Sequence, residues 1–213
     1  MKKATLSALG GAALCLSACG PPYGKRVPDA LVEKLPYEMK VELLEAENNL
    51  GVELDKVDEA QNEILRSRDN IRRAKDRRSA AKDEVSAATD AQSKEVAELA
   101  VEEAQARYDY LRARQKVNVA LEDVEEMALR CAFAEYEVAR LTAARKAKVE
   151  GSEKYDPATF DQQVKDCKER VASMKADMKD KESDMAAAKT DWDTKKVSLA
   201  KKTFDARASP YVE

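Results

Sequence analysis

Histidine is absent from the 213-residue sequence, and aromatic residues, glycine and proline are scarce. Without histidine the chain lacks the commonest general base and metal ligand, and it cannot form a Ser-His or Cys-His nucleophile pair. Aromatic residues make up only 5% of the chain, with six glycines and six prolines, too few for the core and turns of an ordinary globular domain. Charge is abundant instead: 38 basic and 41 acidic residues fill 37% of the sequence, a composition typical of long amphipathic helices.

Motifs of catalysis are also missing. The sequence contains no phosphate-binding loop and no nucleophile elbow, and its many carboxylates form no pair that stands out from the rest. Its acidic stretches lack the glycine-containing spacing of a calcium loop. We therefore expect no enzymatic activity, no cofactor, no metal ion and no small-molecule substrate.

The first nineteen residues carry a targeting pattern. Lys2 and Lys3 precede an apolar stretch, residues 4–18, that is too short to span a bilayer and is typical of a secretory signal. The stretch ends in Leu16-Ser17-Ala18-Cys19, which resembles the lipobox of bacterial lipoproteins. The resemblance implies cleavage before Cys19, acylation of Cys19 with chains such as palmitate, and, because Gly20 follows, anchoring in the outer membrane facing the periplasm. A secreted protein without lipid, cut at a nearby site, is the alternative.

Residues 19–35 are expected to form the lipidated cysteine and a proline-rich tether, with two helical turns from Asp29 to Leu35. Beyond Pro36 the sequence reads as helix, and the 99 residues between Gly51 and Gly151 contain neither glycine nor proline. Aliphatic residues recur every seven positions from Leu43 to Val85, with mostly small residues three positions further on.

Two further apolar seams follow. One runs from Val96 to Leu141 with Glu103 as its one lapse, and the other runs from Phe160 to Leu199 with Lys181 and Lys195 as interruptions. The heptad slips by four residues between Val85 and Val96, which indicates a turn or a stutter over residues 86–93.

The loop around residues 151–156 is the clearest break, with Gly151 suited to a helix C-terminus and Asp156-Pro157 to the next helix start. We therefore predict an all-α fold: an elongated antiparallel three-helix coiled-coil bundle over residues 36–208, with a tail at 209–213. Its helices would span about 37–88, 94–148 and 157–207. The alternative is one very long helix with the C-terminal helix folded back on it.

The four cysteines separate into two groups. Cys15 leaves with the signal and Cys19 takes the lipid, which leaves Cys131 and Cys167 on seam positions either side of the loop. Folding the chain there brings them to similar heights, so we expect a disulfide between them in an oxidising periplasm. Two buried free thiols are the alternative.

One strongly basic run interrupts the first seam. Seven cations lie within thirteen residues: Arg66, Arg68, Arg72, Arg73, Lys75, Arg77 and Arg78. Behind a lipoprotein signal the anions they would meet are lipid headgroups, lipopolysaccharide or an acidic protein face rather than nucleic acid. A solvated helix face is the plainer interpretation.

Together these patterns predict a membrane-anchored, periplasm-facing structural or scaffolding protein of the cell envelope. The layout resembles that of bacterial coiled-coil lipoproteins. The expected partners are the lipid bilayer, through Cys19, and another protein or a second copy of the chain, through the helical faces. The alternatives are a periplasmic holdase chaperone for outer-membrane proteins and an accessory subunit of an envelope transport or motility complex.

Overall fold

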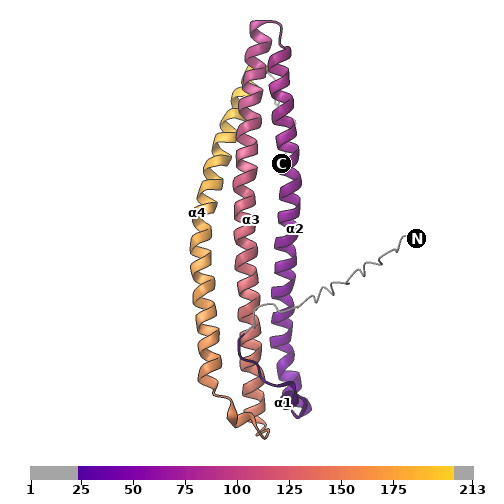
Figure 1. The fold of residues 1–213 in the computed structure, drawn as a ribbon, viewed down its shortest axis with the longest axis vertical. Helices are drawn as coiled ribbons and strands as arrows, with labels where there is room; N and C mark the ends of the chain where they lie inside the picture. Colours follow the sequence, from indigo (N-terminus) through magenta and orange to yellow (C-terminus); the bar gives the residue numbers. More distant parts are fainter. Residues whose placement is uncertain (1–23, 204–213) are drawn as a thin grey trace, which may run out of the picture.

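The computed structural model describes residues 24–203, so the signal segment, Cys19 and the tail at 209–213 lie outside the described residues. Within them the chain forms α1 (Asp29–Glu33), α2 (Tyr37–Ala87), α3 (Ala91–Lys146), the short 3₁₀ helix η1 (Ser152–Lys154) and α4 (Pro157–Thr203). The three long helices run up, down and up beside one another (Figure 1). The all-α, antiparallel helical fold predicted from the seams is confirmed.

Residues 86–93 contain a turn. α2 ends at Ala87, and α3 begins three residues beyond Ala88, after Asp90. The Asp90 carboxylate accepts hydrogen bonds from the backbone N–H groups of Gln92 and Ser93, and the Ser93 side chain accepts one from the Asp90 N–H. This reciprocal cap satisfies donors that a helix start leaves open. The alternative of one long helix through this region is wrong.

The seam of α2 packs against α3 as its heptad spacing predicts. Its buried residues all belong to the seven-residue series and the small-residue series beside it: Leu43, Val57, Ala60, Ile64, Ser67, Ala74 and Ala81. The small members allow the two helix backbones to approach closely.

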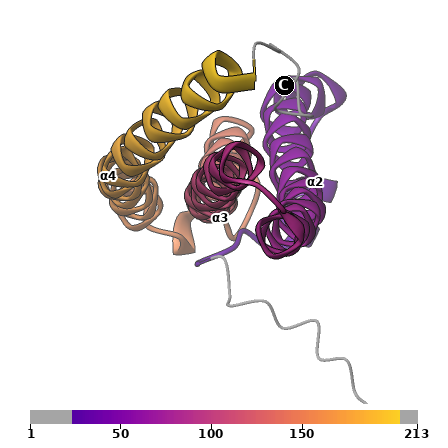
Figure 2. The same cartoon turned by 90° about the horizontal axis from the view of Figure 1, so that it is seen from above.

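The bundle is an open layer with α3 in the middle. α2 and α4 each pack along α3, and within residues 24–203 they have hardly any contact with one another. Seen from above, the two outer helices lie on different sides of α3 (Figure 2). α3 is therefore buried on two sides, whereas most seam residues of α4, such as Met174 and Met178, are only half-buried. Both broad faces of the layer are exposed to solvent except at the lower end, where residues 24–28 lie across α3 and α4.

The C-terminal end of α3 is capped by a motif that the sequence does not indicate. α3 ends at Lys146, and Lys148 adopts the left-handed conformation with φ of 54°. The Val149 N–H bonds to the Ala144 carbonyl and the Lys148 N–H to the Arg145 carbonyl, the pair of bonds of a Schellman motif. The expectation that Gly151 ends this helix is wrong, because the buried side chain of Val149 fixes the motif two residues earlier. Gly151, with φ of 93°, instead begins η1.

Two apolar clusters hold the layer together. The lower cluster joins Val27, Leu31 and Leu35 to Leu43 of α2, Leu141 of α3 and Phe160 of α4. The upper cluster joins Ala74 of α2, Tyr110 and Leu111 of α3 and Trp192 of α4. The lower end is where the N-terminal segment completes a core shared by all three long helices.

Candidate functional site

The segment that begins five positions after Cys19 is docked on the lower end of the layer. We call residues 24–28 the N-terminal strap. The Lys25 N–H donates to Oε1 of Gln163 on α4 at 2.6 Å, and the Val27 N–H donates to Oε2 of Glu137 on α3 at 2.6 Å. The Val27 side chain is only 1% exposed. The strap therefore crosses from α4 over α3 and inserts a side chain into the lower cluster.

Gly24 is required where the strap meets α4. Its φ is +81°, a conformation that side-chain-bearing residues rarely adopt. A Cβ atom built there would lie 2.5 Å from Oε1 of Gln163, the atom that accepts the Lys25 N–H. Another residue at position 24 would be strained at this φ and would have to displace either the Gln163 side chain or the strap.

A buried ion cluster lies under the strap. Arg140 Nη1 donates to Glu137 Oε1 at 2.9 Å, and Arg140 Nη2 donates to the carboxylate of Asp29 at the start of α1. Both Glu137 and Arg140 are buried. Burial alone would lower the pKa of Arg140, but the hydrogen bonds and charges of Asp29 and Glu137 outweigh it and raise that pKa. The cluster thus fixes the strap and α1 to α3 through charge-assisted bonds.

This docking shortens the tether. The segment expected to serve as a tether covers residues 19–35, but from Gly24 onward it lies on the helices and includes α1. Gly24 lies five positions after Cys19, and five fully extended steps of the chain span at most about 17 Å. A lipid on Cys19 would therefore be coupled to a rigid body rather than to a long flexible linker.

The disulfide predicted between Cys131 and Cys167 is present and joins α3 to α4. Their Cα atoms are 5.5 Å apart. The bridge lies above the residues on which the strap docks, Glu137 on α3 and Gln163 on α4. It gives the half-buried helix α4 a covalent link to the centre of the layer.

Glu103, the one polar residue in the second seam, is buried and accepts a hydrogen bond from Trp192, the only tryptophan in the sequence. The Trp192 indole Nε1–H donates to Glu103 Oε1 at 2.7 Å, and the two residues are 1% and 2% exposed. The Trp192 ring stacks on Tyr110 with centroids 5.5 Å apart, and the Arg107 guanidinium carbon lies 5.3 Å from the ring centroid. Lys195, an interruption of the third seam, bonds to Glu102 on α3 at 2.7 Å. These polar residues fasten the upper half of α4 to α3.

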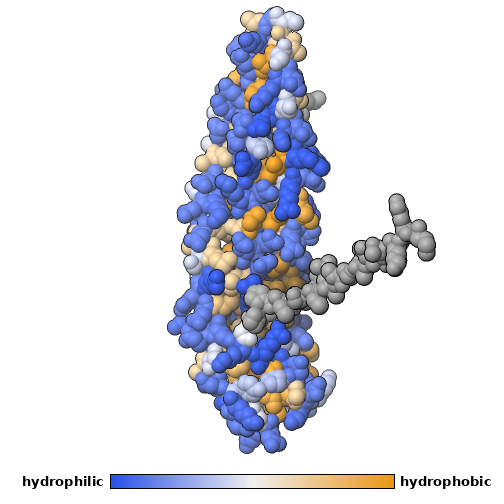
Figure 3. All heavy atoms as spheres, in the orientation of Figure 1, coloured by the Kyte–Doolittle hydropathy of each residue, from blue (hydrophilic) through white to orange (hydrophobic). Residues whose placement is uncertain are grey.

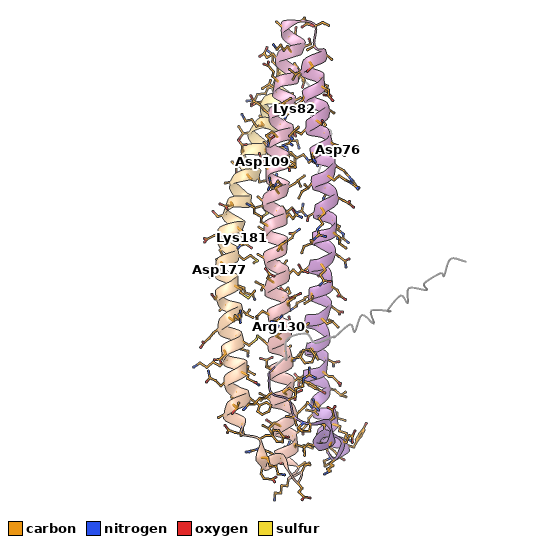
Figure 4. The ribbon with its side chains drawn as sticks, viewed as in Figure 1. Asp76, Lys82, Asp109, Arg130, Asp177 and Lys181 are labelled. Atoms are coloured by element: carbon orange, nitrogen blue, oxygen red, sulfur yellow. A yellow bond between two sulfur atoms is a disulfide. The ribbon has the colours of Figure 1, made fainter. Side chains whose placement is uncertain are left out.

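The seven residues of the basic run differ in their exposure to solvent. Arg77 pairs with Glu84 at 2.7 Å, and Arg78 donates to Gln105 and lies 4.5 Å from the Tyr108 ring centroid. The other five, Arg66, Arg68, Arg72, Arg73 and Lys75, are exposed. Acidic residues are interleaved with them, among them Asp76, which Figure 4 labels on α2 below Lys82. The structure thus leaves five of the seven candidate contact residues exposed, whereas Arg77 pairs within α2 and Arg78 contacts α3.

Residues 24–203 contain no cluster of three or more Cys, Asp and Glu side chains arranged to hold a metal ion. None of the described helices is both long enough and apolar enough to cross a membrane. The hollows along the layer are shallow; one of about 270 Å³ is lined by Val52 of α2, Ala128 and Ala132 of α3 and Val171 of α4. Comparisons with protein-family models, with curated proteins and with solved structures found no match for this chain.

Proposed function

We propose that the protein is a lipid-anchored scaffold of the bacterial cell envelope, without enzymatic activity. In this proposal acyl chains on Cys19 hold it in the outer membrane, and the helical layer faces the periplasm and presents its surfaces to a protein partner. The lipobox supports the anchor, and the observation that carries the proposal is the docking of residues 24–28 directly after it.

The strap docks at the end of the layer that is far from the α2–α3 turn. Glu137, where the strap meets α3, lies 46 residues from the start of α3 at Ala91, which is about 70 Å at 1.5 Å per residue. A force or a partner acting on the α2–α3 turn would be transmitted through continuous helices, the strap and at most about 17 Å of chain to the lipid. Such an arrangement suits a spacer or a scaffold.

The surface fits binding to protein rather than catalysis. The face drawn in Figure 3 is mainly hydrophilic, with separate apolar patches along its length. Among residues 24–203 eight large apolar side chains are exposed, and six of them are on α2: Tyr37, Val41, Leu44, Val52, Leu54 and Leu65. α2 has α3 on one side only, so its outer side is the surface most available to a partner.

Cell fractionation tests the proposal. Cys19→Ser is expected to release the protein from the membrane fraction or to leave its signal uncleaved, and Cys15→Ser, within the signal, serves as the matched control that stays membrane-bound. Density separation of the membranes is expected to place the wild type with the outer membrane. A Cys19→Ser protein that remains cleaved and fully membrane-bound would contradict the anchor.

A further inference from the structure

α2 carries a second stripe that is displaced by one residue from the seam packed against α3, about 100° round the helix. Alternating steps of three and four residues lead from Leu44 to Lys75, and every position on this path is exposed. We call it the α2 stripe; its members used below are Leu44, Glu47, Gly51, Leu54, Leu65, Arg68, Arg72 and Lys75. Steps of three and four keep residues on one face of a helix, which is the spacing of a coiled-coil seam.

The apolar members of the stripe are three leucines whose side chains are exposed to solvent. Leu44, Leu54 and Leu65 are 51%, 51% and 57% exposed. Single exposed leucines are common on protein surfaces and need no explanation. Three on one helical stripe, at positions that a packed helix would bury, indicate a face for another helix.

Gly51 is the second sign of a partner. It lies inside α2 without a positive φ, and a Cβ atom added to it would meet nothing within 4 Å. Neither the backbone nor the packing of one chain therefore calls for glycine, which weakens a helix. Glycine on a contact face allows a neighbouring helix to come close.

The charges specify the direction of the partner helix. Residues 42–63 contain eight acids and one lysine, and residues 66–78 contain seven basic and two acidic side chains. A parallel pair of α2 helices would place like charges together. An antiparallel pair would place the acidic part of each copy beside the basic part of the other.

We propose that two copies of this chain pair through their α2 stripes in antiparallel orientation, with facing residues whose numbers add up to 119. Leu54 of each copy then packs on Leu65 of the other, twice across the two-fold axis. Glu47 faces Arg72 of the second copy, and Gly51 faces Arg68. Leu44 faces Lys75, whose aliphatic stem covers the leucine.

This register follows from the spacing of the stripe. The stripe alternates steps of three and four residues, and it begins and ends with a step of three. In an antiparallel pair in which the numbers of facing residues add up to 119, each step in one copy therefore lies opposite a step of the same length in the other, from position 44 to position 75. That segment is about 48 Å long at 1.5 Å per residue.

The interface is self-complementary, as a two-fold dimer requires. It goes beyond the proposed scaffold role, and it sets the orientation of the dimer: residue 37 of one copy faces residue 82 of the other, so the two lower ends are about 68 Å apart at 1.5 Å per residue. Two paired copies that are both anchored at Cys19 would therefore lie along the membrane rather than stand upright on it.

Disulfide trapping in the intact envelope tests the pairing, with the full-length protein. The double variant L54C/L65C is expected to give a strong covalent dimer on oxidation, and each single variant a weak one. The two positions are about 16 Å apart along one helix, too far for a bridge within a chain. V197C, on an equally exposed α4 position, is the control for random encounter. The proposal would be overturned if L54C alone gave as much covalent dimer as L54C/L65C. It would also be overturned if L54C/L65C gave no more covalent dimer than V197C.

Charge reversal gives an independent readout. Sedimentation of the full-length lipoprotein in detergent is expected to show a dimer dissociation constant raised about tenfold by E47R and by R72E, because each change removes two attractive pairs. The combination E47R/R72E restores the wild-type value in the antiparallel register. An unchanged constant in the single variants, or a further loss in the combination, would refute it.

Discussion

Replacing Trp192 by phenylalanine tests how the upper half of α4 is held. The change removes the indole N–H that donates to Glu103 at 2.7 Å, with both residues almost fully buried. A hydrogen bond to a buried charged acceptor is worth about 2 kcal/mol. The smaller ring also loses volume and part of its contact with the Arg107 guanidinium, worth about 1 kcal/mol more. We expect Trp192→Phe to lower the free energy of unfolding by about 3 kcal/mol.

Urea unfolding followed by circular dichroism at 222 nm is the appropriate assay, because the substitution removes the only tryptophan fluorophore. Glu103→Gln is the matched control, since its amide oxygen still accepts the indole N–H and the cost should be smaller. Glu103→Leu combined with Trp192→Phe should cost less than the sum of the two single changes, because both single changes remove the same hydrogen bond between Glu103 and Trp192. A loss below about 0.5 kcal/mol for Trp192→Phe, or strict additivity in the combination, would refute this account.

Three further predictions concern the strap, the turn and the disulfide. Gly24→Val should displace the strap from the glutamine beneath it and make trypsin cleavage at the two following basic residues several-fold faster; unchanged digestion would show that the strap is not docked there. The backbone N–H of Ser93, together with its side chain, lowers the pKa of Asp90; the stabilisation that this cap provides is therefore complete above the unfolded pKa of about 3.9 and is lost as pH falls through the folded value. NMR titration should find that lowered pKa, whereas an ordinary value would exclude the cap. Reducing the Cys131–Cys167 bridge, which spans 36 residues of sequence, should lower the free energy of unfolding by about 4 kcal/mol, and a urea midpoint unaffected by reductant would contradict this.

The long helices were predictable because their burial follows heptad spacing. Leu43, Val57 and Ile64 are buried as the seven-residue series requires, and the slip of four residues between Val85 and Val96 does mark a turn. The disulfide followed from its two cysteines lying on facing seams.

The second buried face of α3 was not predictable in the same way. It is formed largely by alanines such as Ala97, Ala100, Ala104 and Ala132, and alanine is a strong helix former that also suits exposed helix positions, so it does not by itself mark a buried face. Glu103 looked like a fault in the seam because its partner, Trp192, lies 89 residues away. Buried carboxylates of this kind can be found from sequence only if the facing helix and its register are already known.

The strap was also out of reach of sequence reasoning. Its composition of glycine, proline and basic residues is typical of a flexible linker, and only Val27 is a large apolar residue. Its docking depends on acceptors supplied from far along the chain, Glu137 and Gln163. The antiparallel pairing of α2 and α3 brings the acidic residues of 42–63 near those of 117–138. Most of these acids face solvent, which screens their charges, and Glu63 pairs with Arg114.

The central claim is that a lipid on Cys19 holds this helical layer to a membrane by its lower end. Intact mass analysis of the N-terminal tryptic peptide from the protein purified out of its own envelope tests the claim most directly. The account predicts a peptide of residues 19–25 whose mass exceeds that of its amino acids by a diacylglycerol thioether and an amide-linked acyl chain. A peptide that starts elsewhere, or that begins at Cys19 with an unmodified thiol, would contradict it.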